Sequence, residues 1–187
     1  MMIAIHQPNF FPWMPFFSKM GAVDRFVIMS HCQFEKNNYQ NRFFYRDSWH
    51  TMSVRKGLDS IIEKKYVDPF GDWDRIKRKL SDKSKILSRF DSCISENLAD
   101  TNTKLIVSIA DCLRIQTEIV NDDPTDLKSN ERLIWICKRF GADKYLAGSG
   151  GKNYMEVQKF EEAGIEVLFQ EVELKDKIHV LDVLEGN

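Results

Sequence analysis

The first thirty residues read as a strand, a polar loop, a helix and a second strand. Residues 2–5 form an apolar run, and Pro8 ends strand pairing shortly afterwards because it has no N–H to donate. Aromatic and apolar side chains within residues 13–20 recur at the spacing of one helical face, and residues 25–29 (RFVIM) are a second buried strand. Two such strands joined by a helix form a right-handed parallel crossover, which predicts an α/β fold.

The same order of elements returns near the C-terminus. Asp126 or Ser129 is a candidate cap for a helix that stops at Gly141, where a left-handed turn suits glycine. A short strand, a glycine-rich loop, another helix and a last strand follow between residues 145 and 169. This half of the chain therefore predicts further parallel strands for the same sheet.

The middle of the chain has a different pattern of apolar and charged residues. Residues 42–45 and 51–54 are candidate strands of a hairpin, and residues from about 58 to 117 carry apolar stripes at helical spacing with Lys and Arg on the other faces. Because 187 residues fit one core, we predict a single domain over residues 1–187 with a helical insertion at about 58–117. The predicted fold class is α/β, with a mostly parallel sheet, flanking helices and a Rossmann-like architecture.

Charge and apolar content exclude several classes of function. Lys and Arg number 27 against 28 Asp and Glu, so there is no electrostatic footprint for nucleic acid. No run approaches the ~20 apolar residues of a membrane span, and prolines interrupt the apolar start that a secretory signal would need. The four cysteines stand far apart, which favours free thiols, a cytoplasmic location and no metal site.

Three polar segments follow predicted strands, and the carboxyl ends of parallel strands are where α/β proteins bind ligands. In the first, His6 can act as general acid or base, while Gln7 and Asn9 can hydrogen-bond a neutral ligand such as a sugar. The alternative is a structural histidine that closes the hydrogen bonds of an irregular loop. The second segment combines amides with aromatics, and an ordinary polar loop is its alternative; its candidate binding residues are His31, Gln33, Lys36, Asn41 and Arg42.

The third segment is rich in glycine and precedes a helix. Backbone N–H groups there can approach an anion, and a lysine adds a full charge. It has neither the Walker A nor the dinucleotide-binding spacing, and a simple strand-to-helix turn explains it equally well. Its candidate binding residues are Gly148, Gly150, Gly151, Lys152 and Tyr154.

These segments resemble the WbqC-like family, whose members lie among genes for O-antigen and other surface polysaccharides. The resemblance rests on residues 5–13 (IHQPNFFPW), on Gln33-Phe34 with Asn41-Arg42, and on residues 131–154 from Glu-Arg-Leu to the glycine-rich loop. The family usually has acidic residues just before the Gln-Phe pair, where this chain has Ser30-His31-Cys32. If those acids take part in chemistry, this chain either uses His31 in their place or has a changed activity.

The resemblance implies a transferase of surface-glycan biosynthesis that places an acyl or aminoacyl group on a nucleotide-linked or lipid-linked amino sugar. His6 would take the proton of the attacking amine. A thioester would be the donor, with an acyl-carrier protein as a partner and a homodimer as a candidate assembly. The sugar-orienting residues would be Gln7, Asn9, Gln33 and Asn41, and the phosphate-binding groups Arg42, Lys152 and the amides of residues 148–151.

Two other functions stay open. The order of elements is similar to that of nucleotidyltransferases such as pantothenate synthetase, although Asn9 stands where their second histidine would be. A non-catalytic glycan-binding module is the other alternative, and it needs exposed aromatics near the N-terminus. Of 22 aromatic residues, 12 lie in the first 49 positions, and the candidates for a stacking platform are Phe10, Phe11, Trp13, Phe16 and Phe17.

Overall fold

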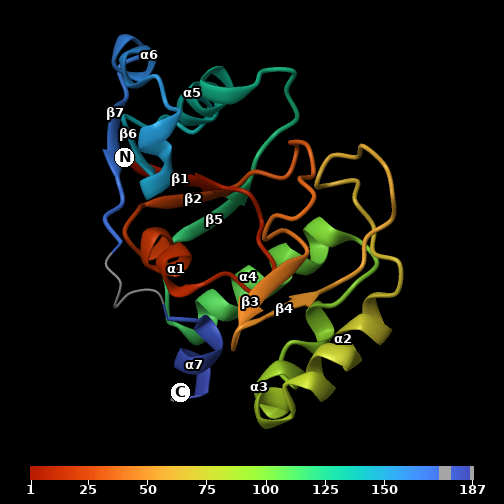
Figure 1. The fold of residues 1–187 in the computed structure, drawn as a ribbon. Coiled ribbons are helices and arrows are strands. Elements are labelled where there is room, and N and C mark those ends of the chain that lie inside the picture. The colour runs from red at the N-terminus through yellow and green to blue at the C-terminus, as the bar shows by residue number, and fades with distance from the viewer. Residues whose placement is uncertain (173–177, 186–187) are drawn as a thin grey trace.

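A five-stranded parallel sheet forms the centre of the molecule, in a computed structural model that describes residues 1–172 and 178–185 (Figure 1). The strand order is β5-β2-β1-β6-β7, so the sheet grows in one direction from β1 through β2 and in the other through β6. The predicted α/β fold with a mostly parallel sheet is confirmed. The strands are β1 (Met2–His6), β2 (Arg25–Ile28), β5 (Glu118–Asn121), β6 (Lys144–Ala147) and β7 (Glu166–Phe169).

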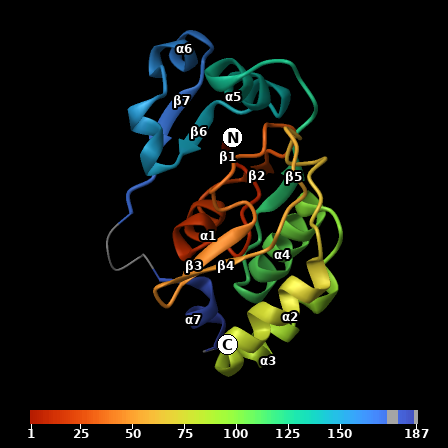
Figure 2. The same cartoon turned by 45° about the vertical axis from the view of Figure 1, so that its right-hand side comes forward.

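Helices cover both faces of this sheet. Figures 1 and 2 show α5 and α6 on one side and α1 with α4 on the other. Successive residues of β1 point to opposite faces, so Ile3 packs toward α5 and α6 while Ala4 packs toward α1 and α4. The helices are α1 (Met14–Gly21), α2 (Pro69–Lys79), α3 (Ser84–Ser88), α4 (Leu98–Cys112), α5 (Ser129–Arg139), α6 (Val157–Glu162) and α7 (Val180–Glu185).

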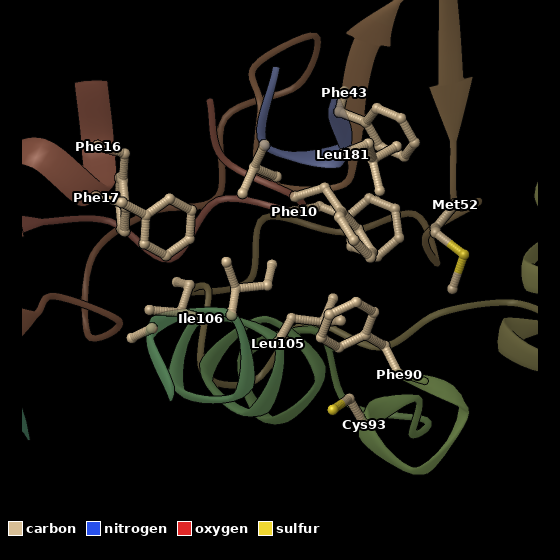
Figure 3. Close-up of a cluster of buried hydrophobic side chains, with 14 of the residues drawn as sticks. Phe10, Phe16, Phe17, Phe43, Met52, Phe90, Cys93, Leu105, Ile106 and Leu181 are labelled. Carbon is tan, nitrogen blue, oxygen red and sulfur yellow. The ribbon is translucent and has the colours of Figure 1, made fainter. Parts of the chain in front are cut away.

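The N-terminal aromatics supply much of the core on the α1 and α4 side. Phe10 and Phe17 lie above α4, facing Leu105 and Ile106 (Figure 3). Among the candidates for a stacking platform, Phe10, Phe11, Phe16 and Phe17 are buried. Trp13, which its helical spacing also assigns to the core, is 44% exposed because it precedes the first residue of α1 and has an extended backbone.

The segment between β2 and β5 carries a hairpin and three α-helices. The hairpin pairs β3 (Arg42–Tyr45) with β4 (Ser48–Thr51), so its second strand lies three residues before the predicted one. Arg46 and Asp47 both have positive φ, and such a two-residue turn matches the twist of the strands. The helices α2 to α4 follow within residues 69–112, inside the stretch predicted to be helical.

β5 has no counterpart in the sequence analysis. It is an edge strand in which only Ile119 and Val120 are apolar and neither is fully buried, so it leaves little hydrophobic pattern. None of the helices within residues 1–172 and 178–185 is both long and apolar enough to cross a bilayer.

Candidate functional site

A cavity of about 1030 Å³ opens at the carboxyl ends of β1, β2 and β5. Its position fits the rule that α/β sheets bind ligands at this edge, next to the point where the strand order reverses. Its volume is at the upper end of the ~300–1000 Å³ that small-molecule sites occupy. One wall follows β1 and β2 and includes His6, Gln7, His31, Cys32, Gln33, Glu35 and Asn38; the opposite wall precedes and begins α5 and includes Asp126, Lys128, Ser129 and Arg132.

Asp122 connects the two walls, because it bonds to His31 on one and faces Arg132 on the other. It follows β5 directly, and its side chain is fully buried. One carboxylate oxygen accepts hydrogen bonds from the Ser30 N–H at 2.8 Å and from His31 Nδ1 at 2.9 Å, and the other lies 3.4 Å from an Arg132 guanidinium nitrogen. Because a carboxylate only accepts, Nδ1 carries the hydrogen in the neutral form of His31, and Nε2 then has the free lone pair.

The start of α5 brings two cationic side chains, Lys128 and Arg132, to the opposite wall, beside Asp126. The predicted caps, Asp126 or Ser129, are wrong, because Ser129 is already the first helical residue and Lys128 precedes it without a side-chain cap. The residue before this helix therefore does not cap its first N–H groups. Arg132 lies in the first turn and is buried, and its Nε has no hydrogen-bond partner among the described residues. These donors, with the exposed Lys128, suit an anion.

His6 enters the same cavity as a neutral group. Its Nδ1 lies 2.8 Å from the Gln7 carbonyl oxygen, and its ring meets Phe16 edge to face at 4.9 Å. Burial, together with the nearby charge of Lys19, lowers the pKa of His6 from 6.5 to about 3. A carbonyl can only accept, so Nδ1 is the protonated nitrogen and Nε2 is an acceptor.

We expect the low pKa of His6 to make the fold acid-sensitive. The unfolded chain binds a proton at His6 near pH 6.5 and the folded chain does so only near pH 3, so the free energy of unfolding falls as pH drops below 6.5. One such group contributes about 1.4 kcal/mol per pH unit between these values. Urea unfolding at pH 7, 6 and 5 should give a shallower pH dependence for His6→Gln than for the parent chain. Parallel curves would contradict the assigned burial.

Comparison with known proteins places this site in a family. The model of the WbqC-like protein family matches residues 7–177. The chain belongs to this family. This WbqC-like chain is also similar to a Mycobacterium tuberculosis protein described as "Uncharacterized protein Rv1507c", with 27% identity over 185 residues that cover 88% of this chain and 80% of the relative. No solved structure matches significantly. Membership of the WbqC-like family is consistent with a role in polysaccharide biosynthesis.

The structure brings together some of the predicted site residues of this WbqC-like chain. His6, Gln7, His31, Gln33 and Tyr154 all line the cavity. The Gln7 side chain is fixed from two sides, because its oxygen accepts from Gln40 Nε2 at 2.7 Å and its nitrogen lies 3.4 Å from Cys32 Sγ. Five of the predicted residues thus share one space.

Other predicted residues lie elsewhere. Asn9 turns to a separate hollow, and Lys36 is exposed outside the cavity lining. Asn41 is buried and donates to the Met52 carbonyl at 2.7 Å, which fixes the hairpin. The Arg42 guanidinium lies 3.9 Å from the centre of the Trp49 ring. These contacts give Asn41 and Arg42 structural partners away from the cavity.

The glycine-rich loop forms a short 3-10 helix over Ser149–Asn153, and α6 begins only at Val157. The structure does not bring Gly148, Gly150, Gly151 or Lys152 to the cavity lining. Lys152 Nζ lies 5.6 Å from the centre of the Phe169 ring. A Cβ on Gly151 would come within 2.9 Å of Met155 Sδ, so packing accounts for this glycine.

Asp122, Lys128 and Arg132 are the functional candidates that sequence reasoning missed. Asp122 follows the strand that left no clear pattern, and only recognition of residues 118–121 as a strand would have placed it at the carboxyl edge. Arg132 belongs to the motif that carries the family resemblance, which is the signal that could have singled it out.

Proposed function

We propose that this protein is a transferase of surface-glycan biosynthesis that places an acyl or aminoacyl group on the amine of a nucleotide-linked or lipid-linked amino sugar. The observation that carries the proposal is the distribution of polar groups in the cavity: amides and imidazoles, with Glu35, on one wall, and the cationic Lys128 and Arg132, with Asp126, on the other. A sugar joined to phosphate likewise has an uncharged part, with hydroxyl groups, and an anionic part. Family membership supports the class of pathway.

Binding follows from the two walls. Gln7, Gln33 and Asn38 offer amide donors and acceptors to sugar hydroxyls. The N–H groups that begin α5, the Arg132 guanidinium and Lys128 bind the phosphate. The phosphate-binding role expected for the glycine-rich loop passes to α5, because α5 lines the cavity.

His31 is the proposed base, and Asp122 orients it. The sugar amine attacks the carbonyl carbon of a thioester, so a C–N bond forms, the C–S bond breaks and a thiolate leaves. His31 Nε2 takes the proton of the amine and returns it to the thiolate, while the Asp122 carboxylate stabilises the charged imidazole. His6, which is neutral at pH 7, accepts a hydrogen bond from the substrate. The donor is a thioester such as that of an acyl-carrier protein.

A cytoplasmic location is part of this proposal. The four cysteines of the chain are free, and Cys93 and Cys137 are buried. Free thiols persist in a reducing compartment, and a thioester donor would be available there.

A thermal-shift screen tests the binding step. We expect UDP-, dTDP- or GDP-linked amino sugars to raise the unfolding midpoint, because a ligand that binds only the folded state stabilises it. Lys128→Ala should weaken that binding roughly tenfold, since it removes a charged partner of the phosphate. Arg139→Ala on the same helix is the control, because its side chain is exposed and pairs with Asp123 away from the cavity.

Two outcomes would overturn the proposal. Stabilisation by ATP with magnesium but by no nucleotide sugar would favour nucleotidyl transfer. A flat response to every nucleotide, nucleotide sugar and coenzyme A would leave a non-catalytic module as the better interpretation.

A further inference from the structure

A second, aromatic hollow of about 350 Å³ lies on the other side of the loop that follows β1. Three of its rings remain substantially open to solvent: Trp13 is 44% exposed, Tyr39 50% and Phe44 46%. Aromatic rings of this size usually bury most of their surface, so three open rings around one hollow indicate a binding surface. The hollow is lined by Asn9, Phe10, Phe11, Pro12, Trp13, Tyr39, Phe43, Phe44 and His179.

His179 lines this hollow and carries a ring nitrogen without a partner among the described residues. Its Nδ1 accepts a hydrogen bond from the Leu181 N–H at 3.2 Å, so in the neutral ring the hydrogen is on Nε2. Burial keeps the ring neutral by lowering the pKa of His179 to about 4. Nε2 is buried and has no hydrogen-bond partner among residues 1–172 and 178–185. An unpaired buried N–H costs about 1–3 kcal/mol, so an acceptor that reached Nε2 would stabilise the protein.

The walls of the hollow are preformed. Phe11 has a positive φ of 47°, a conformation that is strained for an aromatic residue. The ring is held in place by stacking on Trp73, at 5.6 Å and 17°, and by Phe43 at 5.4 Å. The His179 ring also packs on Phe43, with 5.2 Å between ring centres. A rigid aromatic wall loses little entropy when a ligand binds.

The chemistry of the walls selects the ligand. Open aromatic faces favour an apolar surface, while the Asn9 amide and the His179 N–H need polar partners. Among the described residues that line the hollow, none carries a charge at neutral pH, so a charged ligand has no counter-ion there. An alkyl chain satisfies the rings and leaves the His179 N–H unpaired. A pyranose ring presents an apolar C–H face and hydroxyl acceptors together.

A shared ridge separates this hollow from the main cavity. Gln7 and Asn38 line the main cavity, and Asn9 and Tyr39, one or two residues further on, line the aromatic hollow. The Phe10 N–H donates to the Tyr39 carbonyl at 2.9 Å, which joins the two segments of the ridge. The two spaces therefore lie next to each other along these two segments.

We propose that the aromatic hollow is a saccharide subsite that stacks a neutral pyranose ring on Trp13 and Tyr39 and hydrogen-bonds it through Asn9 and His179. Its assignment to the acceptor glycan, next to the sugar that reacts, rests on the proposed function. Binding of a pyranose ring in this hollow does not depend on the proposed function.

Saturation-transfer NMR with methyl N-acetylglucosaminide, methyl glucoside and octanoate tests the subsite. We expect the glycosides to receive saturation at ring C–H protons and octanoate to receive none. Trp13→Ala and Tyr39→Ala should each weaken glycoside binding about three- to tenfold, the effect of losing one aromatic contact. His179→Phe keeps an aromatic ring and removes the N–H, and should also weaken binding. Phe70→Ala, at an exposed aromatic of α2, is the control.

The outcomes separate this inference from the proposed function. Binding of octanoate in place of the glycosides, or glycoside binding that Trp13→Ala and Tyr39→Ala leave unchanged, overturns the saccharide subsite. Glycoside signals that persist in Lys128→Ala, together with a flat nucleotide-sugar screen, support the subsite and count against the transferase alone.

Discussion

Asp122→Ala is expected to lower the free energy of unfolding by about 3–5 kcal/mol, which is the usual cost of removing one partner from a buried ion pair. The carboxylate is fully buried and faces the Arg132 guanidinium, which is itself buried. Its loss leaves that charge without a partner and also removes the acceptor of the Ser30 N–H. Urea unfolding of the two chains at pH 7 measures the difference.

Asp123→Ala is the matched control for this prediction. Asp123 is the next residue in the chain, and it pairs with Arg139 on the surface, where both side chains are about half exposed. Exposed pairs contribute about 0–1 kcal/mol, so the control should unfold close to the parent chain. Equal losses at the two positions would mean that Asp122 does not hold the buried network together.

A double variant separates stability from function at this position. Asp122→Leu with Arg132→Met replaces the buried pair by apolar side chains, and such replacements are often neutral or stabilising. We expect the double variant to recover most of the stability lost in Asp122→Ala. It should still fail to bind a nucleotide sugar, because the guanidinium at the start of α5 is gone.

The architecture was predictable from sequence where one pattern fixed one element. The apolar run of β1, the proline after it and the aromatic spacing of α1 agree with each other. The elements β1, α1 and β2 all lie where they were expected. The parallel pairing then follows from the crossover, with Ile3 opposite Arg25. Burial of the sheet on both faces makes these strands apolar throughout and therefore easy to recognise.

The site was less predictable because it depends on side-chain direction within short loops. Gln7 and Asn9 are two residues apart and were assigned to one ligand, yet Gln7 enters the main cavity and Asn9 enters the aromatic hollow. Pro8 lies between them, and its carbonyl accepts a hydrogen bond from the buried Asn102 amide at 2.8 Å. A contact 94 residues away in sequence thus fixes this loop, and no local pattern reports it.

The α5 side of the cavity was also difficult to predict from sequence. A missing helix cap leaves donors open for a ligand, and a sequence search for good caps looks for the opposite signal. The basic residues that suit phosphate by their chemistry alone are engaged in other contacts, Arg42 with Trp49 and Lys152 with Phe169. A need for basic residues was therefore predictable from sequence, but which basic residues line the cavity was not.

His31→Gln is expected to reduce turnover by roughly 10²–10⁴-fold, the range that a positioned general base contributes. The variant keeps an amide donor for Asp122, so the buried network and the unfolding midpoint should change little. It has no group that can accept the proton of the attacking amine. Release of thiol from an acyl or aminoacyl thioester, with the amino-sugar nucleotide that stabilises the protein, measures the rate.

His6→Gln is the comparison that tests the division of roles between the two histidines. If His31 is the base and His6 only a hydrogen-bond acceptor, His6→Gln should raise KM for the amino sugar and lower kcat by less than His31→Gln does. Asp122→Asn should lower kcat as well, because an amide that donates to Nδ1 favours the wrong tautomer of His31. A larger loss of kcat in His6→Gln than in His31→Gln would contradict this division. His6, at the end of β1, would then be the general base, as the sequence analysis predicts.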